Sequence, residues 1–92
     1  MARGRSGESF EQYSRDLGVR LHQLRVDRGL TQERLAAAAD ITTYTYRKLE
    51  KGESNPGTPA NPRLRTLLAL AEVLDVNLAE LLPPDIPQAI GR

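Results

Sequence analysis

The chain has 92 residues, of which 39% are hydrophobic and 27% charged, with a formal net charge of +1 and no cysteine. A chain of this length and composition is typical of one ordinary globular domain. The missing cysteines exclude disulfides and thiolate metal sites, and one histidine leaves the common transition-metal sites short of ligands, so we expect no metal and no cofactor. No run of about 18 apolar residues occurs, so no membrane-spanning helix is expected.

The charges are unevenly distributed along the chain. Residues 1–71 hold 12 Lys and Arg against 8 Asp and Glu, whereas residues 72–92 hold Arg92 against four acidic residues. A basic body with an acidic end is typical of a protein that turns one face toward phosphates. A randomly mixed surface is the alternative that these counts leave open.

The chain begins with a predicted flexible, basic arm over residues 1–8, followed by a long helix over residues 8–28. The apolar stripe of this helix recurs at spacings of three and four, through Phe10, Tyr13, Leu17, Leu21 and Leu24. Gly18 lowers the helix propensity locally by about 1 kcal/mol relative to Ala. A break at Gly18, with a separate short helix before it, is therefore the alternative.

Two short helices follow, separated by only a few residues. The first is predicted over residues 32–39 with Thr31 as its N-cap, and the second over about residues 43–50 with Thr42 as its N-cap. Gly52 fits the C-terminal stop of the second. Two short helices joined in this way are the layout of a helix-turn-helix.

The second half of the chain starts with a breaker-rich segment over residues 52–62, where we expect a loop without regular structure. A strong amphipathic helix is predicted over residues 63–74. Asn77 caps a short fifth helix that runs through Leu82, and two prolines end it. The remaining segment, residues 83–92, is expected to be a loose tail.

Three stretches, Arg25–Ala36, Ile41–Gly52 and the leucine-rich segment 67–82, resemble the Cro and phage-repressor family of helix-turn-helix proteins. Several separate elements match in the right order and at the right separations. The resemblance implies an all-α, lambda-repressor-like bundle of about five helices, with the DNA-binding domain over residues 9–82 and the helix-turn-helix over about residues 31–51.

The same resemblance implies a bacterial or phage-like transcription regulator that binds double-stranded DNA as a homodimer. A cytoplasmic location is the default expectation for a chain without cysteine. The third helix would enter the major groove. An enzyme is not expected, because the sequence offers no clustered nucleophile, acid/base pair or metal site, and His22 lies in the middle of the first helix among leucines.

The resemblance also assigns roles to individual residues. Gln32, in the first turn of the second helix, matches the family's phosphate-binding glutamine. Base edges would be reached by Thr43, Tyr44 and Lys48; Thr suits a thymine methyl or a base acceptor, and Lys suits guanine O6 and N7. Tyr44 is bulky for this position, so stacking on the sugar–phosphate edge or packing against apolar atoms stays open. Further phosphate contacts are expected from Thr42, Thr45, Arg47 and Lys51.

Arg25 and Glu50 match a buried or half-buried ion pair of the family, which ties the first helix to the end of the third. Removing one partner of such a pair would strand a charge, at a cost of about 3–5 kcal/mol. Two separate surface charges are the alternative.

The segment 52–62 departs from the family, because it is several residues longer than the usual link. Contact with the DNA backbone, extension of a dimer surface and mere exposure to solvent are all open roles. Arg63 and Arg65, which follow it, are candidates for phosphate contacts. The dimer surface is expected on the fifth helix and the tail, through Leu78, Leu81, Leu82, Ile86 or Ile90.

Two other functions are compatible with the sequence. One is a protein-interaction module that has kept this fold, such as an antitoxin that binds a partner toxin, which an acidic, leucine-containing end would suit. The other is a nucleoid protein that binds DNA without sequence preference.

Overall fold

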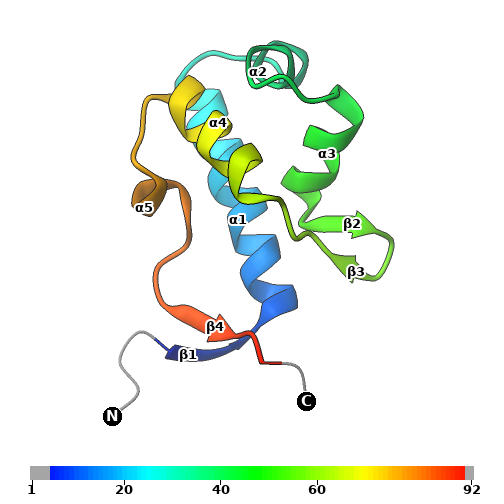
Figure 1. The fold of residues 1–92 in the computed structure, drawn as a ribbon, viewed down its shortest axis with the longest axis vertical. Coiled ribbons are helices and arrows are strands. Elements are labelled where there is room, and N and C mark those ends of the chain that lie inside the picture. Colours follow the sequence, from blue (N-terminus) through cyan, green and yellow to red (C-terminus); the bar gives the residue numbers. More distant parts are fainter. Residues whose placement is uncertain (1–4, 91–92) are drawn as a thin grey trace.

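The computed structural model describes residues 5–90, which form five α-helices and four short strands (Figure 1). The five-helix bundle predicted from the sequence is confirmed, with every helix boundary within about two residues of its expected place. The helices are α1 (Phe10–Asp27), α2 (Gln32–Ala38), α3 (Thr43–Lys51), α4 (Leu64–Leu74) and α5 (Leu78–Leu81).

The segment between α3 and α4 is not an irregular loop, so that expectation was wrong. It contains an antiparallel hairpin of β2 (Glu53–Asn55) and β3 (Thr58–Pro59). Its breaker residues form the turn, where Gly57 has a φ of 80°. The hairpin is anchored at its base, because the Ala60 amide donates to the Gly52 carbonyl at 2.9 Å.

The two ends of the described chain also carry regular structure that the sequence did not predict. The strand β1 (Arg5–Ser9) pairs in parallel with β4 (Ile86–Gln88), within segments expected to be a flexible arm and a loose tail. No local sequence pattern predicts that two segments so far apart in the chain will pair. The domain boundaries after residues 8 and 82 stay predictions, and the part of the arm before residue 5 lies outside the described residues.

The helix caps predicted for the two short helices are confirmed. The side chain of Thr31 accepts a hydrogen bond from the Arg34 amide at 3.0 Å, and that of Thr42 accepts one from the Thr45 amide at 3.0 Å. Gly52 ends α3 in the left-handed conformation, with φ 78°. Helices of 7 and 9 residues are not stable alone, so these caps need tertiary support.

That support is an aliphatic core in which the helix-turn-helix is embedded. Leu35 of α2 and Tyr46 of α3 are completely buried, Leu49 of α3 is 6% exposed, and Ile41 packs against them from the turn. Burying each such side chain contributes about 1.5–3 kcal/mol. Together these four residues hold the two short helices on the bundle. Leu81 of α5 is also completely buried, so its assignment to a dimer surface was wrong.

Gly18 does not break α1, which runs continuously through it. It is the point where α3 meets α1 backbone to backbone. A Cβ atom at Gly18 would lie 2.3 Å from the Glu50 carbonyl oxygen and 2.7 Å from the Leu49 carbonyl oxygen. Only a residue without a side chain allows the C-terminal end of α3 to come this close, and this approach brings Glu50 opposite Arg25.

The variant Gly18→Ala tests this contact. Helix propensity alone would stabilise α1 by about 1 kcal/mol, but the displaced α3 backbone should turn this into a net loss of about 2 kcal/mol. Urea unfolding followed by circular dichroism measures the change. The neighbouring Val19→Ala, at a 54% exposed position of the same helix, should stay within about 0.5 kcal/mol of the parent protein. A stabilised Gly18→Ala protein would contradict the close approach.

Candidate nucleic-acid interface

Helix α3 has one side in the core and one side in solvent. Tyr46 and Leu49 face inward, whereas Tyr44 is 68% exposed and Thr43 and Lys48 are partly exposed. The three residues predicted to reach base edges are therefore accessible together. Residues 44 and 48 are one helical turn apart, so their side chains lie on the same face.

Tyr44 and Lys48 also contact each other. The Lys48 Nζ lies 4.4 Å from the centroid of the Tyr44 ring, within the range of a cation–π interaction. The sequence shows only that the two residues are four positions apart, and it does not predict this contact.

The hydroxyls at the start of α3 are joined to one another. Thr42 Oγ1 accepts from the Thr45 amide and donates to Thr45 Oγ1 at 2.9 Å. The Thr45 hydroxyl accepts this bond and keeps its own O–H for another acceptor. A phosphate oxygen placed at this helix end would find both that hydroxyl and the positive end of the helix dipole.

The carboxylate of Glu50, at the end of α3, joins three helices. Arg25 of α1 donates from Nε to Glu50 Oε2 at 2.6 Å and from Nη2 to Oε1 at 3.3 Å. The Tyr46 hydroxyl of α3 donates to Oε2, and Gln32 of α2 donates from Nε2 to Oε1 at 3.0 Å. The side chains of Arg25 and Glu50 are only 13% and 9% exposed, so this is the ion pair expected from the sequence rather than two surface charges.

The surroundings of Glu50 keep it ionised. Burial would raise the pKa of its carboxyl group, but hydrogen bonds from Arg25, Tyr46 and Gln32 outweigh burial and lower the pKa below its ordinary value of 4.5. The hydrogen bond to Glu50 raises the pKa of Arg25. Burial, followed by the bond to Glu50, raises the pKa of the Tyr46 hydroxyl well above 10.0, so this hydroxyl stays a donor.

The side chain of Gln32 already forms two hydrogen bonds within the protein, which the sequence did not predict. Its Nε2 donates to Glu50, and its Oε1 accepts from Arg47 Nε at 3.2 Å. Arg47 also forms an exposed ion pair with Glu33, at 3.0 Å from Nη2 to Oε2. One hydrogen of the Gln32 amide remains for a phosphate, and Arg47, which uses two of its five N–H donors in these contacts, can also donate to a phosphate.

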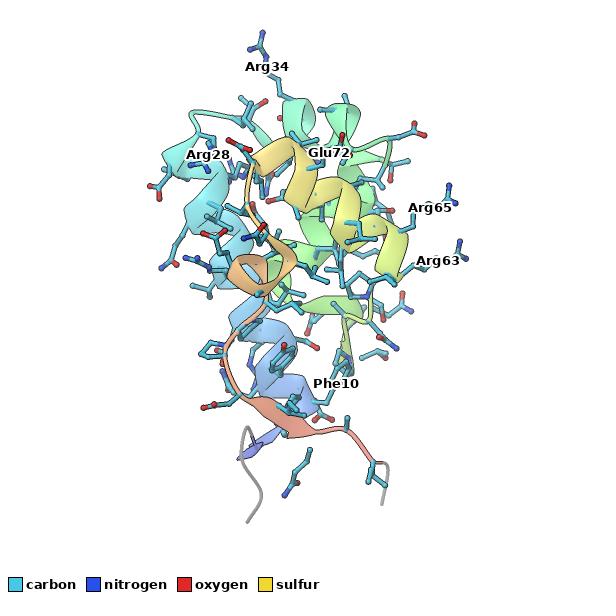
Figure 2. The ribbon with its side chains drawn as sticks, turned by 60° about the vertical axis from the view of Figure 1, so that its left-hand side comes forward. Phe10, Arg28, Arg34, Arg63, Arg65 and Glu72 are labelled. Atoms are coloured by element: carbon cyan, nitrogen blue, oxygen red, sulfur yellow. The ribbon has the colours of Figure 1, made fainter. Side chains whose placement is uncertain are left out.

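Three more arginines project from this region into solvent. Figure 2 shows Arg34 pointing away from the molecule beyond α2, and Arg63 and Arg65 leaving the first turn of α4. The sequence singled out Arg63 and Arg65 but not Arg34, although Arg34 lies in the same helical turn as Gln32. His22 is exposed beside Glu50, with its Nδ1 at 3.4 Å from Glu50 Oε1.

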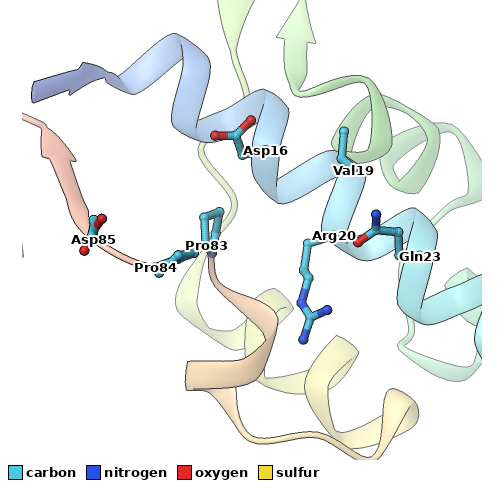
Figure 3. Close-up of a pocket in the computed structure, with 7 residues that line it drawn as sticks. All are labelled: Asp16, Val19, Arg20, Gln23, Pro83, Pro84 and Asp85. Carbon is cyan, nitrogen blue, oxygen red and sulfur yellow. The ribbon is translucent and has the colours of Figure 1, made fainter. Parts of the chain in front are cut away.

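A shallow groove lies between α1 and the segment after α5 (Figure 3). Its walls are formed by Asp16, Val19, Arg20, Gln23, Pro83, Pro84 and Asp85. Arg20 Nε donates across it to the Glu80 carbonyl at 2.8 Å. The two carboxylates of the lining belong to Asp16 on α1 and to Asp85 after α5.

The described residues lack two further kinds of feature. No helix among them is both long and apolar enough to span a bilayer. No group of three or more His, Asp or Glu side chains among them is arranged to hold a metal ion.

The family of helix-turn-helix domains matches residues 16–82, so the chain belongs to this family. The restriction-modification controller protein C.AhdI of Aeromonas hydrophila has a similar structure, with 32% identity and a TM-score of 0.65 over 74% of this chain and 94% of that protein. The Cro and phage-repressor type of fold recognised from the sequence is thereby confirmed. No curated protein sequence matches the chain.

The biofilm regulator SinR of Bacillus subtilis is similar in three structures, that of its DNA-binding domain and those of two complexes. In its complex with DNA, SinR shares 28% identity and a TM-score of 0.61 over 71% of this chain and 95% of that chain. In its complex with the protein SinI, the values are 27% and 0.61, over 72% of this chain and 59% of that chain. The proteins with a similar structure thus include a regulator that has been solved in complex with DNA.

The variant Glu50→Gln tests the importance of the buried carboxylate. Loss of its charge leaves Arg25 without a counter-ion in a nearly buried position, and we expect a loss of about 3 kcal/mol in the free energy of unfolding. The matched control is Glu33→Gln, whose partner Arg47 is 54% exposed, and it should cost less than about 1 kcal/mol. Urea unfolding measures both variants. An equal loss in the free energy of unfolding would contradict the prediction that the buried ion pair matters more than the exposed one.

The lowered pKa of Glu50 also predicts how stability depends on pH. A carboxyl group with a lower pKa in the folded state stabilises the protein above its unfolded pKa and loses that contribution as the pH falls through the folded value. The difference in stability between the parent protein and Glu50→Gln should therefore be full at pH 7 and shrink below pH 4.5. Chemical unfolding at stepped pH measures it, and a difference that is constant down to pH 3 would refute the assignment.

Proposed function

We propose that this protein is a sequence-specific transcriptional regulator that inserts α3 into the major groove of double-stranded DNA. The observation that carries the proposal is the division of α3 into a side locked in the core and a polar, accessible side with Thr43, Tyr44 and Lys48. A helix fixed in this way can be presented to a groove about 12 Å wide without first becoming ordered. The similarity to SinR, whose structure has been solved in complex with DNA, also supports DNA binding.

In this proposal the contacts divide into two sets. Thr43, Tyr44 and Lys48 read base edges and decide the sequence. The second set binds phosphates and supplies affinity that weakens strongly with salt. It consists of Gln32, Thr42, Thr45, Arg47 and Lys51.

We propose a homodimer that reads two half-sites about 34 Å apart, one helical turn of DNA. Two of the residues expected on the dimer surface, Ile86 and Ile90, are 61% and 72% exposed. Two others, Leu78 and Leu82, are partly buried against the core. The surface therefore centres on β4 and the residues after it rather than on α5. Its apolar side chains would be removed from water on association.

No enzymatic activity is part of this proposal, and the cytoplasmic location expected from the sequence stays a prediction. A regulator of this kind acts by binding to a particular DNA site, so the proposed function needs no catalytic acid, base or nucleophile.

One observation favours the alternative of a protein-interaction module. Val19 is 54% exposed in the groove between α1 and the prolines that follow α5, and this groove lies on the opposite side of α1 from α3 in Figure 1. The structure of SinR with SinI shows that a relative binds a protein. Binding to random duplex DNA at low and moderate salt separates the two functions, because an interaction module has little affinity and no steep salt slope.

Two substitutions separate base reading from phosphate binding. Lys48→Ala should change the sequence preference and lower affinity for the preferred duplex by about tenfold, whereas Gln32→Ala should weaken all duplexes alike. Fluorescence anisotropy with the preferred and a scrambled duplex measures both. Equal effects of the two variants on both duplexes would overturn the assignment, and Glu11→Gln, at the far end of α1, should leave both affinities unchanged within about twofold.

A further inference from the structure

If α3 enters the major groove as proposed, the contact between Lys48 and Tyr44 influences which base pairs the helix recognises. This inference rests on the proposed function. The Lys48 ammonium sits over the Tyr44 ring at 4.4 Å from its centroid, while the ring itself is 68% exposed. In the part of the chain that the structure describes, no carboxylate forms an ion pair with Lys48. The ring is thus the charged group's one recorded partner there.

A lysine on a helix surface normally samples many rotamers, and fixing it on binding costs entropy. The ring of Tyr44 reduces this cost, because the negative face of the aromatic system attracts the ammonium group. Lys48 is therefore partly positioned before DNA arrives. Positioning of this kind raises affinity without any additional contact.

The two groups also differ in the chemistry that they present. The ammonium group donates hydrogen bonds and matches the O6 and N7 acceptors of guanine in the major groove. The exposed part of the ring is apolar and matches the C5-methyl group of thymine. The two groups are only 4.4 Å apart, so together they reach a small region of the groove. Guanine and thymine belong to different base pairs, which are stacked about 3.4 Å apart, so neighbouring pairs are the arrangement that places both bases within this reach.

We propose that Tyr44 and Lys48 act as one unit that reads a guanine and a thymine on neighbouring base pairs. Tyr44 holds Lys48 on the guanine and contacts the thymine methyl group. This assigns Tyr44 a positioning role as well as a base contact, and it decides between the open roles of its bulky ring. It also defines a feature of the preferred half-site, a guanine next to a thymine.

Selection from a pool of random-sequence duplexes tests the unit. The parent protein should enrich a motif with neighbouring guanine and thymine pairs, and Tyr44→Phe, which keeps the ring, should enrich the same motif. Tyr44→Ser, which removes both the ring and the apolar surface, should lose the preference at both positions, although Lys48 is intact, whereas Lys48→Ala should lose only the guanine. If Tyr44→Ser retains the guanine preference, the unit does not exist; if the parent protein enriches no motif, the proposed function itself fails.

Modified duplexes of the selected sequence give a second, chemical test. Replacement of the thymine by uracil removes one methyl group and should weaken binding of the parent protein by about fourfold, but leave Tyr44→Ser unaffected. Replacement of the guanine by 7-deazaguanine removes N7 and should weaken the parent protein but not Lys48→Ala. A uracil effect of the same size in the parent protein and in Tyr44→Ser would overturn the thymine contact. Thermal unfolding of each variant, at this exposed position, should match the parent protein and exclude misfolding as the cause.

Discussion

Arg25 and Glu50 meet in a nearly buried ion pair, and the position of α3 follows from it. The carboxylate of Glu50 receives hydrogen bonds from Arg25 on α1, Gln32 on α2 and Tyr46 on α3, so one charged group unites three helices. Two of these helices are too short to persist alone. The pair forms only because Gly18 lets the end of α3 approach the α1 backbone. A buried ion pair is weak evidence for net stability, but breaking one is costly, so it favours a single arrangement of the helices.

The same network extends from the interior to the surface proposed to meet DNA. Glu50 fixes one end of the Gln32 amide, Gln32 contacts Arg47, and Arg47 reaches Glu33 in solvent. Tyr44 and Lys48 of α3 also contact each other in the free protein. Both sets of side chains are thus partly arranged in the free protein, which lowers the entropy lost on binding.

The sequence predicted the features that local patterns encode. The helices and the Thr31 and Thr42 caps follow from spacing and capping chemistry, and the Arg25–Glu50 pair followed from family resemblance. What it missed depends on contacts between distant segments. Nothing local distinguishes Gly18 as a packing glycine from a helix breaker, announces the pairing of β1 with β4, or shows that Gln32 is held by Glu50.

The most direct test of the account is a titration of ¹⁵N-labelled protein with its selected duplex, followed by NMR. We predict that amide shifts change at the start of α2 and along Thr43–Lys48, and that amides beside the buried carboxylate, such as Leu49, keep their free-state positions because α3 docks as a rigid body. Changes confined to the groove between α1 and Pro83–Pro84, with α3 unaffected, would contradict the account.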